Sequence, residues 1–237
     1  MTPPRASSPI VVSLLASARF ARGIARLDSA RDAAAVEDLE RAARLTPDDV
    51  EAQLNLGRAL HNLLRPAEAV AAFDRVLALD SKTPLARFHR GMALYALGEF
   101  ERAVGDLDRQ IAADPDYPPA YLLRGLALLE TPRWREAERD LETAVARAPE
   151  SARAWLGLGR ARLRVERFEE AAAALRKAAA AAPDDPASLN ALVVALLRLG
   201  RADEAAPLRR RAAELARAGR AADPGEIRFE GARSSGR

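Results

Sequence analysis

The chain has 237 residues, a formal net charge of +3 and no cysteine. The lack of cysteine excludes disulfides, thiolate metal sites and cysteine nucleophiles. Basic residues number 37 and acidic residues 34, and this near balance indicates a mixed surface rather than one specialised for polyanions.

The N-terminal residues 1–9 are rich in proline and serine, so we expect them to be disordered. Residues 10–18 then read IVVSLLASA and admit two interpretations. They start a first helix over 10–27 in a cytoplasmic protein, or residues 1–18 act as a signal peptide of an exported one. We favour the helix, because Gly23 continues the spacing described next. No run approaches the roughly 20 apolar residues that a membrane span needs.

Several positions recur every 34 residues along the chain. One holds proline, with serine in a single copy; a second holds alanine; a third holds glycine, with valine in the last copy. These positions are Pro47, Ser81, Pro115, Pro149 and Pro183; Ala69, Ala103, Ala137, Ala171 and Ala205; and Gly57, Gly91, Gly125, Gly159 and Val193. Each copy reads as two short helical patterns around a polar break. Two short helices cannot bury a core alone, so the copies are expected to stack.

The fifth copy, 152–185, resembles the tetratricopeptide repeat (TPR) family, whose pattern is Trp-x-x-Leu-Gly-x-x-Tyr followed by Ala, Phe and Pro. Arg162 stands in place of the tyrosine and Leu175 in place of the phenylalanine. The residues that match are Trp155, Leu158, Gly159, Ala171 and Pro183.

The resemblance implies an all-α fold, a right-handed superhelical solenoid of about six helix-turn-helix repeats. We expect the solenoid over residues 10–219 and a disordered tail over 220–237. The repeats are expected at about 16–49, 50–83, 84–117, 118–151, 152–185 and 186–219.

Between the paired helices, Gly98 and Gly200 suit the left-handed conformation that ends a helix. Phe100, Trp134 and Phe168 follow at equivalent places. Aromatic residues at this repeat spacing are typical of a core. We therefore expect the three rings to fill the gap between helices of adjacent units.

The last repeat is irregular. Pro207 falls about one turn into its second helix, which predicts a late start or a kink, because proline removes a backbone hydrogen bond. Arg209, Arg210 and Arg211 follow. This triplet could contact nucleic acid or an acidic partner, but we favour a solvated face at the end of the solenoid.

The sequence offers no catalytic or metal-binding constellation. His61 and His89, the two histidines, lie 28 residues apart at different repeat positions, so they form no metal-ligand pair. Paired carboxylates such as Asp48-Asp49 fit helix starts, where acidic groups complement the helix dipole. We expect no enzyme activity, no metal and no cofactor.

In the TPR family the first helix of each repeat lines a concave groove. Carried onto this sequence, the expected groove is apolar in the middle and basic toward its C-terminal side. Its residues are Leu54, Arg58, Phe88, Met92, Tyr95, Leu122, Leu126, Leu129, Arg153, Leu156, Arg160, Arg164 and Arg198. The leucines Leu54, Leu122 and Leu156 fit a packed core equally well, whereas we expect Met92 and Tyr95 to be open to a ligand.

These features predict a non-catalytic scaffold or adaptor that binds a peptide or helix of another protein, apolar with acidic residues beside it. Some TPR proteins clamp a C-terminal carboxylate with a lysine and asparagine set, but Leu54 and Arg58 occupy its first places here. Two alternatives stay open. One is RNA binding through the Arg-rich C-terminal end, and the other is self-association of the chain through its apolar groove.

Overall fold

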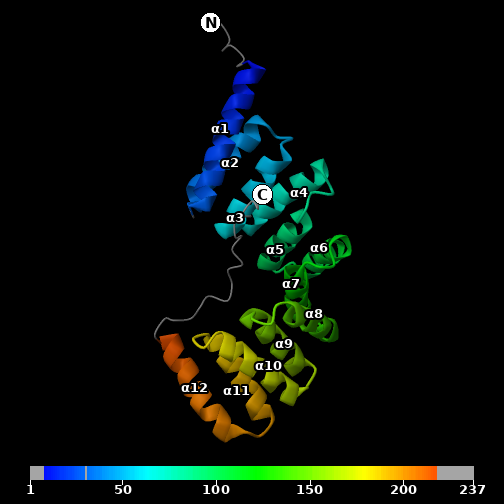
Figure 1. Cartoon of the computed structure of the whole chain (residues 1–237), viewed down its shortest axis with the longest axis vertical. Coiled ribbons are helices and arrows are strands. Elements are labelled where there is room, and N and C mark those ends of the chain that lie inside the picture. Colours follow the sequence, from blue (N-terminus) through cyan, green and yellow to red (C-terminus); the bar gives the residue numbers. More distant parts are fainter. Residues whose placement is uncertain (1–7, 30, 218–237) are drawn as a thin grey trace. The chain divides into compact units, whose positions relative to one another are not determined.

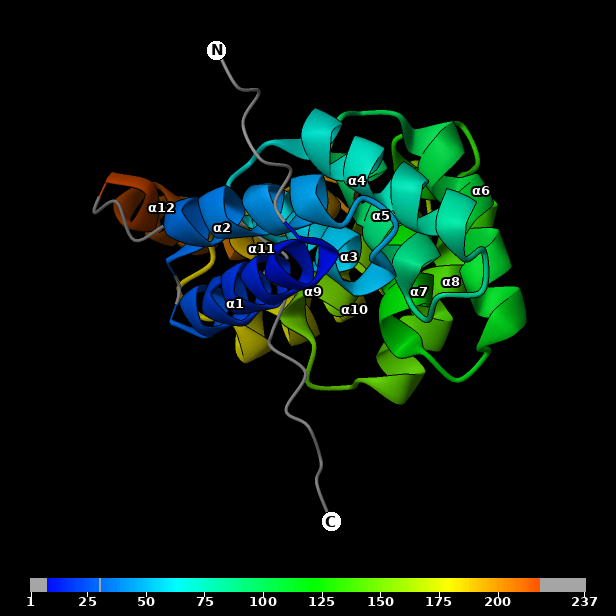
Figure 2. The same cartoon turned by 90° about the horizontal axis from the view of Figure 1, so that it is seen from above.

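The computed structural model describes residues 8–29 and 31–217, which form twelve α-helices and no strand. The helices form two compact units, with the boundary after Gly98. The first contains α1 to α5 and the second α6 to α12 (Figures 1 and 2). Except at residues 8 and 9, the termini expected to be disordered lie outside the described residues.

The first unit begins with two complete helix pairs, in which α1 packs against α2 and α3 against α4. Helix α5 then packs against α4 and also contacts α3. The helices are α1 (Pro9–Asp28), α2 (Asp32–Leu45), α3 (Val50–Asn62), α4 (Pro66–Leu79) and α5 (Ala86–Ala96).

The second unit contains three complete pairs, α7 with α8, α9 with α10 and α11 with α12, preceded by α6. The first helices of successive pairs also touch, because α7 contacts α9 and α9 contacts α11. The helices are α6 (Phe100–Ala113), α7 (Pro118–Leu129), α8 (Trp134–Arg147), α9 (Ala152–Arg164), α10 (Phe168–Ala181), α11 (Pro186–Arg198) and α12 (Ala202–Arg217).

The predicted helical pairs are confirmed, and two finer expectations can be compared with the structure. Residues 10–18 lie within α1, as the helix interpretation expected. Of the two alternatives expected at Pro207, a late start or a kink, the late start is wrong, since α12 begins at Ala202 and continues past that proline. Among the described residues, no helix is both long and apolar enough to cross a membrane.

Local sequence signals fix where the helices begin. The Asp49 carboxylate accepts hydrogen bonds from the backbone N–H groups of Glu51 and Ala52, at 3.0 and 3.1 Å. Asp185 caps α11 in the same manner. Each such cap satisfies N–H groups that a helix start leaves without an intrahelical partner, and contributes about 1 kcal/mol.

In four turns between paired helices, the residue at an equivalent place of the repeat adopts the left-handed backbone conformation. Gly98 and Gly200 adopt φ of +77° and +71°, which confirms the sequence expectation. Leu64 and Glu166, at the same place in other repeats, adopt it without being glycine. The turn geometry is therefore imposed by the packing of the two helices, which outweighs the strain of about 1–2 kcal/mol for a side-chain-bearing residue.

In four helix pairs, the recurring glycine of the first helix sits directly against a large side chain 16 residues later, on the second helix of the same pair. A Cβ added to Gly125 would come within 2.7 Å of Leu141 Cγ, and one on Gly57 within 2.6 Å of Phe73 Cε1. The large partner is fully buried in each pair. The four contacts of this kind are Gly23 with Leu39, Gly57 with Phe73, Gly125 with Leu141 and Gly159 with Leu175.

We predict that Gly125→Ala lowers the free energy of unfolding of the second unit by about 1–3 kcal/mol, because the new methyl group overpacks the contact with Leu141. Gly105→Ala is the matched control, since a Cβ there meets nothing within 4 Å inside α6. Alanine at this helical position should instead stabilise the protein by about 0.5–1 kcal/mol. Urea unfolding followed by circular dichroism measures both, and equal effects of the two substitutions would contradict the packing argument.

Candidate functional site

The residues predicted to line the groove lie on first helices, distributed over the two units. Those of the first unit are Leu54 and Arg58 on α3 and Phe88, Met92 and Tyr95 on α5. Those of the second unit are Leu122, Leu126 and Leu129 on α7, Arg153, Leu156, Arg160 and Arg164 on α9, and Arg198 on α11.

Four of the apolar residues expected in the groove are core residues. Phe88 is 5% exposed, Met92 2%, Leu126 5% and Leu129 4%. Met92 in particular differs from the expectation that it is open to a ligand. These side chains pack against neighbouring helices, which removes them from water. The apolar middle of the expected groove is thus largely filled by the protein itself.

The remaining predicted residues of the first unit, Leu54, Arg58 and Tyr95, are half-buried. The Arg58 guanidinium donates a hydrogen bond to Asn55 Oδ1 at 3.0 Å. Burial lowers the pKa of Arg58 from its usual value.

His89 is a buried histidine in the same region of the first unit. Its ring stacks on Phe73, with centroids 5.8 Å apart, and lies tilted beside Phe88 at 5.6 Å. Burial, followed by the positive charges of Arg58 and His61, lowers the pKa of His89 to about 3. His89 is therefore a neutral core residue, and its contacts are those of an aromatic side chain.

A hollow of 460 Å³ opens in the second unit between the C-terminal halves of two first helices, α9 and α11, and the starts of two second helices, α8 and α10. Beside it, Val194 and Leu197 on α11 are 47% and 50% exposed. The residues that line the hollow are Trp134, Arg160, Leu163, Arg164, Glu166, Phe168, Val194 and Arg198. We call this lining, together with Leu197, the Arg–aromatic surface.

Two arginines of this surface lie over aromatic rings. The guanidinium of Arg164 is 5.6 Å from the centroid of the Trp134 ring, and that of Arg198 is 5.9 Å from the centroid of Phe168. Both distances are within the range of a cation–π interaction. Within the described ranges, no carboxylate forms an ion pair with either arginine.

The other two predicted arginines of the second unit have different surroundings. Arg160 forms an ion pair with Glu130, with Nη2 and Oε1 3.3 Å apart. Arg153, near the start of α9, is half-buried and is not among the residues that line the hollow. The structure therefore brings Arg160, Arg164 and Arg198 together and leaves Arg153 out.

Trp134 and Phe168 lie against residues of the next repeat, as the sequence predicts, but they are not fully buried core residues. Both are half-buried and line the hollow. Each is the first residue of a second helix and so lies at one end of its helix pair. A signal was present in the sequence. Arg164 follows Trp134 by 30 residues, and Arg198 follows Phe168 by the same interval.

Most neighbouring arginines are held by carboxylates. Arg124 donates to both carboxylate oxygens of Asp140 at 2.7 Å and also to Asp108 at 2.7 Å. These bonds raise the pKa of Arg124. On α1, three arginines converge on the buried carboxylate of Asp38 and lower its pKa. Against this background, Arg164 and Arg198 differ from their neighbours.

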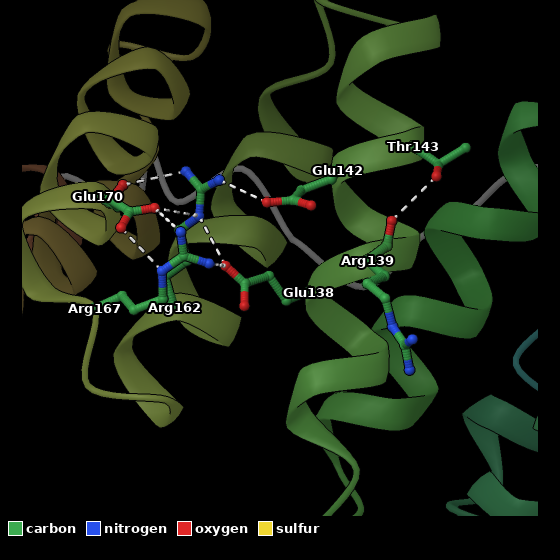
Figure 3. Close-up of polar contacts among 7 residues, drawn as sticks. All are labelled: Glu138, Arg139, Glu142, Thr143, Arg162, Arg167 and Glu170. Atoms are coloured by element: carbon green, nitrogen blue, oxygen red, sulfur yellow. Dashed lines mark hydrogen bonds and ion pairs between the residues drawn. The ribbon is translucent and has the colours of Figure 1, made fainter.

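An ionic network centred on the buried carboxylate of Glu138 occupies the place of the missing tyrosine of the fifth repeat. Arg162, at that position, donates to Glu138 at 3.2 Å and to Glu142 at 2.9 Å, and Arg167 also donates to Glu138 (Figure 3). Glu170 in turn accepts hydrogen bonds from Arg167. These charge-assisted bonds connect α8, α9 and α10 and so hold the elements that carry the Arg–aromatic surface. Figure 3 also shows Thr143 donating to the backbone carbonyl of Arg139 on α8.

No group of three or more histidine, cysteine or acidic side chains suited to a metal ion occurs in the part of the chain that the structure describes. What the Arg–aromatic surface offers chemically is binding, through guanidinium N–H donors beside exposed apolar side chains.

Comparison with known proteins identifies the family. The family profile described as tetratricopeptide repeat matches residues 20–84, 62–118, 122–186 and 157–226, which together cover well over half of the chain. The chain belongs to the tetratricopeptide repeat family. Proteins of this family generally act as non-catalytic scaffolds for protein–protein interaction. No curated protein matches the sequence.

Three solved structures illustrate the similarity. MamA (residues 41 to the end) from Desulfovibrio magneticus RS-1 is 27% identical, with a TM-score of 0.66 over 71% of this chain and 96% of that one. A tetratricopeptide repeat protein from Parabacteroides merdae ATCC 43184 is 20% identical, with a TM-score of 0.69 over 82% and 77%. A chain of the APC/C hetero-tetramer Cut9-Hcn1 is 16% identical, with a TM-score of 0.70 over 93% and 44%. The last two similarities concern the fold alone.

We predict that the stability of the first unit falls by about 1 kcal/mol between pH 7.5 and pH 5.5 because of His89. The folded pKa lies below the unfolded value near 6.5, so the unfolded chain takes up a proton first. The stabilisation is complete above the unfolded pKa and is lost as the pH falls toward the folded one. Urea unfolding at both pH values measures this.

His89→Leu should remove most of the pH dependence while keeping an apolar group of similar size, whereas His61→Asn should retain it. A pH dependence that disappears in the His61 variant and persists in the His89 variant would contradict the assignment.

Proposed function

We propose that this chain is a non-catalytic adaptor whose Arg–aromatic surface binds an acidic, partly apolar segment of another protein. The observation that carries the proposal is the pair of arginines, Arg164 and Arg198, each within cation–π distance of a ring and without a carboxylate partner among the described residues. They border a hollow edged by exposed apolar side chains.

Stacking prepares each guanidinium to bind an anion. Each guanidinium lies 5.6 or 5.9 Å from a ring centroid and forms no ion pair with a carboxylate among the described residues, so its N–H groups can donate to a ligand carboxylate. A side chain already held in place loses less conformational freedom when a ligand arrives. Arg164 and Arg198 should therefore bind carboxylates more strongly than freely moving surface arginines do.

The exposed apolar residues define the second half of the ligand. Val194 and Leu197 lie on the same helix as Arg198, one turn or less from it, and each leaves about half of its surface in water. Covering a side chain of this size contributes about 1 kcal/mol when half of its area is removed from water. The partner segment should therefore carry an apolar side chain beside its acidic ones.

A protein ligand agrees with the surface better than RNA does. The two rings that could stack with a base are Trp134 and Phe168. Each already has an arginine over one of its faces. In the Arg-rich stretch of α12, Arg211 forms an ion pair with Asp184 at 3.1 Å.

The test is fluorescence anisotropy with a labelled eight-residue peptide that combines two glutamates with one leucine in a proline background. We expect binding at micromolar affinity, weakened at least tenfold by the double substitution Arg164→Glu and Arg198→Glu, because the carboxylates then meet like charges. The matched control is Arg209→Glu with Arg210→Glu on α12, which changes the net charge equally and should leave the affinity within twofold.

Equal loss in both double variants would show that net charge alone drives the binding and would contradict the proposal. A labelled uridine oligonucleotide that binds more tightly than the peptide, with steep salt dependence, would favour the RNA alternative instead.

A further inference from the structure

The two arginine–ring pairs are copies of one another, displaced by one repeat. Arg164 and Arg198 are 34 residues apart, as are Trp134 and Phe168. The two stacking distances, 5.6 and 5.9 Å, are nearly the same. The Arg–aromatic surface therefore presents the same cationic group twice, at equivalent positions on α9 and α11.

Helix packing sets the distance between these two groups. Helices α9 and α11 contact each other directly. Packed helices have axes about 8–10 Å apart, so equivalent side chains on the two helices are separated by a similar distance. A ligand that binds both arginines must place two anionic groups about 8–10 Å apart on the same side.

Few peptide conformations meet this condition. A polyproline II segment has three residues per turn and a rise of about 3.1 Å, so side chains at i and i+3 lie on one side about 9 Å apart. In a strand, side chains on one side repeat every two residues, at about 7 Å. In an α-helix, neighbours at i and i+4 are about 6 Å apart along the axis, and only the i and i+7 pair, about 10 Å apart, would approach the required distance.

We infer that the ligand of this surface is a segment in polyproline II conformation with two acidic side chains three residues apart, one for Arg164 and one for Arg198. The inference rests on the proposed function and specifies its ligand. An apolar residue at one of the two intervening positions contacts Val194 and Leu197, which lie within one turn before Arg198 on α11.

Acidic residues of the protein limit the series to two binding positions. Glu130, which precedes Arg164 by 34 residues, occupies the equivalent position after α7 and is paired with Arg160. A third acidic residue of the ligand on that side would meet a like charge. Glu166 also lines the hollow and disfavours an acidic residue between the two arginines.

The experiment measures the affinity of the full chain for four labelled proline-rich peptides, each with one leucine and two glutamates separated by two, three, four or six positions. The peptide with glutamates three positions apart should bind about tenfold more tightly than the others, because it alone engages both arginines without distorting the polyproline II conformation. The Arg198→Gln variant should bind all four peptides equally, with the affinity of the weaker ones, since it retains only one of the two arginines. An unchanged urea unfolding midpoint shows that this variant remains folded.

The outcomes separate the two proposals. If the four peptides bind the wild-type chain equally, the spacing inference is wrong while the proposed function stands. A preference for glutamates two or four positions apart would also overturn it, in favour of a strand or a helix. If no peptide binds at any spacing, the proposed function itself fails.

Discussion

The structure depends on the close contact, made in four helix pairs, between a glycine of the first helix and a large apolar side chain of the second. Without a Cβ at Gly125, the α7 backbone approaches Leu141 on α8 closely enough to exclude water from the pair. The same contact recurs at Gly159 and Leu175, so pairs of similar geometry repeat along the chain. This regularity places residues 34 positions apart in equivalent environments, which is why one arginine–ring pair is accompanied by a second.

Under the proposed function, the arginines that stabilise the fold differ from those that bind the partner. In the second unit, Arg124 and Arg162 are engaged with carboxylates that connect neighbouring helices, so their donors are committed to the fold. Arg164 and Arg198 instead rest on aromatic rings, an arrangement that orients the guanidinium without using its N–H donors. The proposed anionic partner would therefore bind there without breaking an ion pair of the protein.

The fold was predictable from the sequence because the 34-residue spacing of glycine, alanine and proline reports backbone contacts directly. The site was predictable only in part. Register placed Arg164 and Arg198 on one face, and both line the same hollow, but Met92 and Leu126 are core, since register assigns a face of a helix and not how far neighbouring helices cover it. Trp134 was assigned to the core because the pattern did not reveal that the start of a second helix remains partly open to water.

The most direct measurement follows the two indole N–H signals of the chain by ¹H–¹⁵N NMR while the proline-rich peptide with glutamates three positions apart is added. Trp134 lies beneath Arg164 in the Arg–aromatic surface, whereas the Trp155 indole donates to the Pro149 carbonyl at 2.8 Å and its ring lies below Lys177. Our account predicts that the Trp134 signal shifts with saturation and the Trp155 signal does not. Movement of the Trp155 signal alone, or of neither at saturating peptide, would contradict it.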